Sequence, residues 1–87
     1  MNMQAIVMPT SIFSNPEKGT VNVTMTDMQT GGSISIKGEL AKPWGIELEK
    51  AYKMIGRFMS RRDDKGGNWL QALDAKFEPI EMAIPKL

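Results

Sequence analysis

Residues 42–62 read KPWGIELEKAYKMIGRFMSRR, and the spacing of their apolar side chains decides the fold expected for this chain. These side chains recur every three or four residues, which places them on one side of an α-helix. They are Trp44, Leu48, Ala51, Tyr52, Ile55, Phe58 and Met59. Pro43 suits a first helical turn, because its missing N–H costs nothing there. The stretch therefore predicts a long helix from Lys42 to Arg62.

The residues before this stretch predict three strands. Residues 3–8 form a short apolar run that Pro9 stops, and the turn-forming residues at 9–19 indicate a loop. Residues 20–26 and 33–37 alternate apolar and polar side chains on either side of the turn sequence DMQTGG at 27–32. Alternation on both sides of a turn predicts an antiparallel hairpin.

The residues after the long stretch predict a short helix and a last strand. Asn68 resembles a helix N-cap, with Gln71 three residues later as in a capping box. The apolar face that follows consists of Trp69, Leu70, Leu73 and Phe77. Pro79 would end this helix. Residues 80–84 alternate again before Pro85, which predicts a terminal strand.

The order strand, hairpin, long helix, short helix, strand predicts an α+β fold in a single domain over residues 1–87. The hairpin and the N- and C-terminal strands would form a small, mainly antiparallel sheet, with the long helix packed across one face. Trp44 and Trp69 are each in phase with a predicted helix stripe, so both are expected in the core.

The composition argues against an enzyme. The chain of 87 residues contains no cysteine and no histidine. These absences remove Cys/His zinc sites, Ser-His-Asp and Cys-His triads, and the usual proton carrier at neutral pH. The glycine pairs at 31–32 and 66–67 lack the context of a nucleotide-binding loop. We therefore expect no catalytic site, metal or cofactor, and an enzyme that uses Tyr52 or Lys53 is the weakest hypothesis.

The charge and hydropathy pattern also restricts the partners. Eleven basic and ten acidic residues give a net charge of +1, so no strong field of either sign attracts a partner from a distance. No apolar run approaches the roughly 20 residues that cross a bilayer, and the N-terminus lacks the basic region of a signal peptide. These features predict a cytoplasmic protein without a membrane partner.

Two groups of residues are candidates for binding a partner. Ile12 and Phe13 interrupt the predicted loop, where they either pack against the core or form an exposed apolar anchor. The second group is the basic end of the long helix with the glycine-containing loop after it. It consists of Arg57, Arg61, Arg62 and Lys65. These cations either contact phosphate or complement the helix C-terminus and pair with Asp63 and Asp64.

The polar face of the hairpin is a third candidate surface. It carries the hydroxyl and amide side chains of Thr20, Asn22, Thr24, Thr26, Ser33 and Ser35. None of these side chains is aromatic, and unpaired bases stack on aromatic rings in sheet-based nucleic-acid binders. The face is therefore expected to be solvated, and its composition argues against binding of single-stranded nucleic acid there.

The sequence favours a small non-enzymatic protein-interaction module, either an inhibitor or an assembly factor. Proteins of this size are often encoded by phages and mobile elements. The binding surface would be Ile12, Phe13, Arg57, Arg61, Arg62 and Lys65. Ile46 and Met54 lie off the main stripe and would give the helix a second apolar patch, which suggests a homodimer. The alternative is a nucleic-acid-binding protein that contacts phosphates through Lys53 and the four basic residues of that surface.

Overall fold

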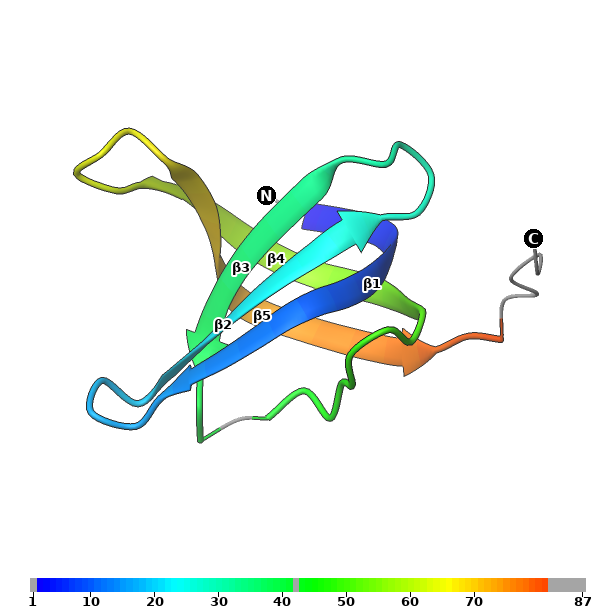
Figure 1. Ribbon diagram of the computed structural model, residues 1–87, viewed down its shortest axis with the longest axis horizontal. Coiled ribbons are helices and arrows are strands. Elements are labelled where there is room, and N and C mark those ends of the chain that lie inside the picture. The colour runs from blue at the N-terminus through cyan, green and yellow to red at the C-terminus, as the bar shows by residue number, and fades with distance from the viewer. Residues whose placement is uncertain (1, 42, 82–87) are drawn as a thin grey trace.

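The computed structural model describes residues 2–41 and 43–81, which form five strands and contain no helix. The strands are β1 (Asn2–Asn15), β2 (Thr20–Asp27), β3 (Ser33–Glu39), β4 (Tyr52–Arg62) and β5 (Asn68–Pro79). They close into a barrel in the order β1-β2-β3-β5-β4, with β4 pairing back to β1 (Figure 1). The chain is therefore all-β, and the predicted α+β fold is wrong.

One junction of the barrel differs from the others. β1–β2, β2–β3, β4–β5 and β1–β4 are antiparallel, whereas β3 and β5 are parallel. The parallel ladder pairs only Ile36 with Leu70 and Lys37 with Gln71. We call this junction the β3/β5 seam. On both sides of these two pairs the described strands have no further partners across the seam.

The predicted long helix is wrong because residues 43–51 form an irregular segment and residues 52–62 form β4. Tyr52, Met54 and Phe58 are buried at 4%, 0% and 0% exposure, at the period of a strand. Ile55 and Met59, which belonged to the expected helix stripe, lie on the outside. Gly56 occupies the inward position between Met54 and Phe58. It breaks the apolar alternation, so the sequence pattern resembles a helical repeat.

Gly56 is required because β4 and β5 approach closely at this point. A Cβ atom on Gly56 would lie 2.1 Å from the carbonyl oxygen of Asp74 and 2.7 Å from the Cα atom of Ala75. The register also shifts here, because Arg57 faces Asp74 while Phe58 faces Ala72. Leu73 is the extra residue of this β-bulge, and bulges bend a strand and increase its twist.

The bulge also explains why the predicted short helix at 68–77 is wrong. Before Leu73 the core-facing residues of β5 are Leu70 and Ala72, and after it they are Ala75 and Phe77. The inward positions therefore change from even to odd numbers at the bulge. This change removes the regular alternation that would have identified a strand.

The N-terminal strand was predicted correctly but is longer than expected. β1 continues through Pro9, pairing with β4 over residues 2–7 and with β2 over residues 7–15. The register shift between Pro9 and Ser11 leaves Thr10 as a bulge residue, a place where a strand tolerates proline. The loop predicted for residues 9–19 is confined to the turn at 16–19.

The hairpin prediction is confirmed, since β2 and β3 pair from Thr20 and Glu39 to Thr26 and Ser33. The Asp27 carboxylate accepts a hydrogen bond from the Gln29 N–H at 2.9 Å in the connecting turn. Gly31 there has a φ of 76°. The strand predicted for residues 80–84 is absent at 80 and 81, and its remainder lies outside the described residues.

The segment between β3 and β4 packs against the barrel interior. Leu40, Trp44 and Ile46 all contact the core. The Trp44 ring covers Gly38, where a Cβ atom would lie 2.4 Å from it, and its centroid is 5.3 Å from that of Phe77. The core position predicted for Trp44 is confirmed. Since Ile46 packs inward and Met54 is fully buried, the second apolar patch expected from these two residues is wrong.

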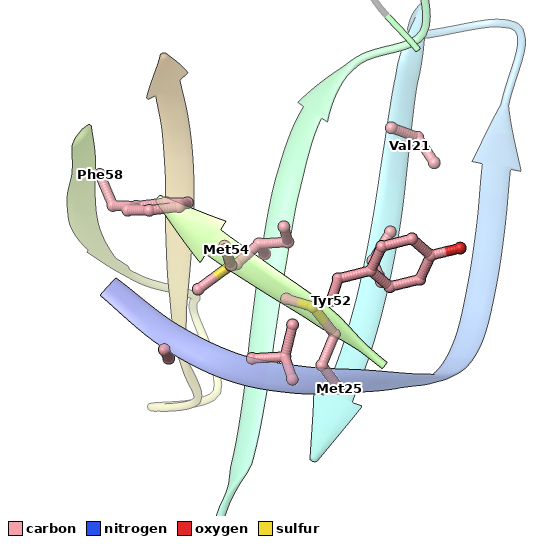
Figure 2. Close-up of a cluster of buried hydrophobic side chains, with 9 residues drawn as sticks. Val21, Met25, Tyr52, Met54 and Phe58 are labelled. Atoms are coloured by element: carbon pink, nitrogen blue, oxygen red, sulfur yellow. The ribbon is translucent and has the colours of Figure 1, made fainter. Parts of the chain in front are cut away.

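The core is contributed by the inward faces of β1 to β4. Its buried members are Ala5, Val7, Val21, Val23, Met25, Ile36, Tyr52, Met54 and Phe58. Figure 2 shows the side chains of Met25, Tyr52 and Met54 inside the barrel, with Phe58 reaching toward β5. No polar side chain is buried among the described residues. The interior is thus apolar, and polar chemistry is confined to the outside of the barrel.

We predict that Gly56→Ala lowers the free energy of unfolding by about 3 kcal/mol, because the added methyl group has to displace backbone of β5. Urea unfolding followed by tryptophan fluorescence measures the change. Gly32→Ala is the matched control, since its Cβ atom would lie 3.3 Å from a flexible Thr30 hydroxyl. We expect the control to change stability by less than about 0.5 kcal/mol. Equal effects of both substitutions would contradict the close β4–β5 approach.

We predict that Tyr52→Phe lowers stability by about 1–2 kcal/mol, because the partly buried Glu47 N–H loses the phenolic oxygen that accepts its hydrogen bond at 2.8 Å. The same urea experiment measures this loss. Thr10→Ala removes an exposed hydroxyl that donates to the Thr24 carbonyl at 3.2 Å, and should have a smaller effect. A Tyr52→Phe protein as stable as the parent would show that this bond does not anchor the segment.

Candidate functional site

The strand register places a row of side chains across the outside of the barrel. Phe13 of β1 faces Asn22 of β2, Asn22 faces Lys37 of β3, and Lys37 faces Gln71 of β5. Residues paired in this way project from the same side of a sheet, with neighbouring strands about 4.8 Å apart. The row therefore crosses four strands over about 14 Å.

Two cations and an indole ring meet at the β5 end of this row. The Lys37 ammonium lies 4.7 Å from the Trp69 ring centroid, within the range of a cation–π contact. Arg61 of β4 is paired with Trp69, and its Nε donates a hydrogen bond to the Gln71 side-chain oxygen at 3.0 Å. We call the surface formed by Asn22, Lys37, Arg61, Trp69 and Gln71 the Trp69 face.

The Trp69 face is hollowed. A groove of about 430 Å³ is lined by Thr20, Lys37, Glu39, Arg61, Trp69 and Gln71. The β1–β2 turn at 16–19 and the β4–β5 loop at 63–67 extend from the same side of the barrel, with β3 between them (Figure 1). Lys18 lies in the first of these connections and Lys65 in the second. The groove therefore lies between two hairpin ends that each carry a lysine together with acidic residues, Glu17 in the first and Asp63 and Asp64 in the second.

The aspartates of the β4–β5 loop form no direct ion pair with the arginines beside them in the described part of the chain. The Asp63 carboxylate accepts hydrogen bonds from the N–H groups of Lys65 at 2.9 Å and Gly67 at 2.7 Å. Its role is therefore to hold the loop. Within the described part of the chain, neither Arg61 nor Arg62 forms an ion pair with Asp63 or Asp64. The pairing that the sequence left open as an alternative does not occur there.

The structure separates the residues predicted for the partner-binding surface into two sets. Phe13 is 61% exposed and lies in the row, Arg61 is part of the Trp69 face, and Arg62 and Lys65 adjoin it at the β4–β5 loop. The other two are placed differently. Ile12 is 37% exposed and faces Val23, and Arg57 lies further along β4 opposite Asp74.

The register also distinguishes the cations by the charge they face. Lys53 is paired with Glu78 and Arg57 with Asp74, so each has a carboxylate residue directly opposite. Lys37 instead faces the uncharged Asn22 and Gln71. Cross-strand pairs of opposite charge compensate each other. Arg61 and Lys37 are therefore better placed than Arg57 and Lys53 to bind an external anion.

Sequence reasoning missed Trp69 and Gln71 as surface residues. Trp69 was expected in the core, but it is not among the side chains that pack against it, so that prediction is wrong. The polar face of the β2–β3 hairpin carries no aromatic ring of its own, but the neighbouring strands supply two. Phe13 from β1 and Trp69 from β5 flank it. The alternation of Trp69 and Gln71 with Leu70 and Ala72 was the signal that could have revealed this.

The Trp69 face suits non-covalent binding. Its groups are cationic, aromatic and amide side chains, and the Thr20 hydroxyl and Glu39 carboxylate line the groove beside them. The described residues contain no group of three or more Asp or Glu side chains that could hold a metal ion. Elsewhere, the Glu47 carboxylate lies 2.5 Å from the Lys50 ammonium and raises the pKa of Lys50 through a hydrogen bond and its charge.

No family model, curated protein or solved structure matches this chain. Among the described residues, no helix has the length and apolar character needed to cross a membrane.

We predict that the two tryptophans differ in solvent access. Trp44→Phe leaves Trp69 as the only indole, and Trp69→Phe leaves Trp44, which packs against the core. Acrylamide should quench the protein that retains Trp69 more steeply. Equal quenching of the two single-tryptophan proteins would contradict the position of the half-buried Trp69 ring at the wall of the groove, away from the core. Unfolding both proteins in urea supplies the control, since the difference should then disappear.

Proposed function

We propose that this protein binds single-stranded nucleic acid across the Trp69 face. The observation that carries the proposal is the Lys37 ammonium over the Trp69 ring in an open groove, with Arg61 beside it. Proteins that bind single strands combine aromatic rings, on which bases stack, with cations that follow the phosphates. The Trp69 face has both kinds of group within one hollow.

The architecture of the barrel supports the same proposal. A small five-stranded Greek-key barrel resembles the OB-fold, in which the β2–β3 face and the β1–β2 and β4–β5 loops bind oligonucleotides or oligosaccharides. The groove here lies between the corresponding loops. This is an analogy of fold, and a fold alone does not establish function. The groove is lined by two cations, Lys37 and Arg61, and one carboxylate, Glu39, and this excess of positive charge favours the polyanionic ligand over a neutral sugar.

A single strand fits the surface better than a duplex. Bases in a duplex stack on each other, whereas a base that stacks on a protein ring has to be unpaired. Phe13 offers a second exposed ring at the far end of the row, about 14 Å from the position of Gln71 by strand spacing. Two separated rings with Lys37 between them suit an extended chain of alternating bases and phosphates.

A protein partner remains the second candidate. The exposed Phe13 near the end of the β1–β2 hairpin offers an apolar anchor for another protein or for a second copy of this chain. This hypothesis retains the interaction module favoured by the sequence. It predicts that Phe13→Ala weakens binding to that partner, whereas Trp69→Ala does not.

We predict that a labelled oligonucleotide of about twelve nucleotides binds at low salt, and that Trp69→Ala weakens its binding by about 5- to 150-fold through loss of stacking. Trp69→Phe should retain most of the affinity, because it retains a ring. Lys37→Ala and Arg61→Ala should each flatten the dependence of log affinity on log salt by about 0.7. Fluorescence anisotropy at several salt concentrations measures both effects.

Lys76→Ala provides the matched control, since Lys76 lies on the outside of β5 opposite Ile55 and away from the row. It also removes one positive charge, so any effect of net charge alone should appear in it equally. No binding at low salt, or equal losses in Lys76→Ala and Lys37→Ala, would overturn the proposed site.

A further inference from the structure

The β3/β5 seam has a hollow on each side of its two residue pairs. On the side after Lys37, Trp44 lies over Gly38 and lines a hollow together with Ala72 and Ala75. On the side before Ile36, a second hollow of about 200 Å³ lies between the two strands. We call it the seam slot. Its lining includes Ser33, Ser35, Ser60, Asn68, Trp69 and Leu70.

We propose that the seam slot holds one unpaired base of the bound strand and recognises the base edge by hydrogen bonds. This inference rests on the proposed function and deepens it, because it assigns to the protein a contact with the base itself in addition to the phosphate contacts. The slot would thus make binding depend on the identity of the base that enters it.

The size and lining of the slot fit a single heterocycle. The hollow is open to solvent and has a volume of about 200 Å³, which is space for one planar ring system. Ile34 and Leu70 contribute apolar surface, and Trp69 contributes an aromatic ring. Stacking and apolar contact are the usual environment of a splayed-out base.

The polar groups of the slot are available to a ligand. In the described part of the chain, the side chains of Ser33, Ser35, Ser60 and Asn68 form no hydrogen bond. An asparagine amide both donates and accepts, and a serine hydroxyl can do either. This matches the mixed donors and acceptors on the edge of a base. The β3 backbone from Ser33 to Ser35 pairs only with β2, so its seam side also lacks a partner.

Trp69 connects the slot to the groove of the two cations. It lines both hollows, whereas Lys37 and Arg61 line only the larger one. A base in the slot would therefore contact the indole while its phosphate lies toward Lys37 and Arg61. The cation groove and the seam slot together accommodate one nucleotide in two chemically distinct parts.

The same open strand edges could in principle pair with a peptide strand. Strand addition derives its affinity from a ladder of main-chain hydrogen bonds along a sheet edge. Here the free stretch of β3 is only Ser33–Ser35, and β5 begins at Asn68, two residues before its first pair across the seam. The short edges, the ring and the adjacent cations favour a nucleotide over a peptide.

The test compares two oligonucleotides of about twelve units, one with bases and one abasic, which carry the same number of phosphates. We expect the parent protein to bind the base-bearing oligonucleotide at least about fivefold more tightly. Asn68→Leu fills the slot without removing a cation. It should reduce the affinity for the base-bearing oligonucleotide toward that for the abasic one, and leave the abasic affinity unchanged.

Gln29→Leu makes a comparable amide-to-alkyl change in the exposed β2–β3 turn and should leave both affinities unchanged. Ser35→Leu is a second slot-filling variant, for use if Asn68→Leu disturbs the β4–β5 loop, and circular dichroism checks the fold of each. Equal affinity of the parent for both oligonucleotides, or unchanged base-bearing affinity in a folded slot variant, would overturn the slot but leave the proposed function standing. Absence of binding to either oligonucleotide at low salt would overturn both.

Discussion

The close approach of β4 and β5 at Gly56 is the constraint on which the rest of the structure depends. Without a side chain at that position, the backbone of β5 comes within van der Waals distance of β4, and the bulge at Leu73 bends the strand. The first part of β5 then reaches β3, where Ile36 and Lys37 pair with Leu70 and Gln71 and complete the barrel. A larger residue at position 56 would push β4 and β5 apart. These strands carry Arg61 and Trp69 of the candidate site.

Barrel closure through such a short parallel ladder also creates the surface that we interpret as functional. Two pairs of residues join β3 to β5, and the strands separate on both sides of them. Trp44 covers the barrel wall at one end of the seam, and Trp69 stands at the other end with its ring beside Lys37. Two tryptophans that look equivalent in the sequence therefore have different roles. Trp44 packs against the core, and Trp69 lines the groove in which we propose that a ligand binds.

The candidate site was only partly predictable from the sequence. Phe13, Arg61, Arg62 and Lys65 were among the residues expected to bind a partner. Phe13 interrupts a polar stretch as an apolar anchor would, and arginine forks beside a glycine-containing loop suit phosphate. Lys37 and Trp69 were not expected there, because their contact depends on β3 and β5 becoming neighbours. The net charge did not indicate an anion-binding surface, because strand pairing decides which charges lie opposite one another. The chain is balanced overall, but strand register places carboxylate residues opposite Lys53 and Arg57, and uncharged residues opposite Lys37.

The sequence by itself determined the β2–β3 hairpin, because its alternation and the turn chemistry of Asp27 and Gly31 act between residues close in the chain. It also determined that the chain lacks cysteine and histidine chemistry. Only the tertiary structure decided that residues 52–62 and 68–79 are strands. Their inward positions are interrupted by Gly56 and by the bulge at Leu73, so local periodicity resembles a helix. The strand conformation is favoured instead by hydrogen bonds and burial between segments distant in the sequence, which no local pattern contains.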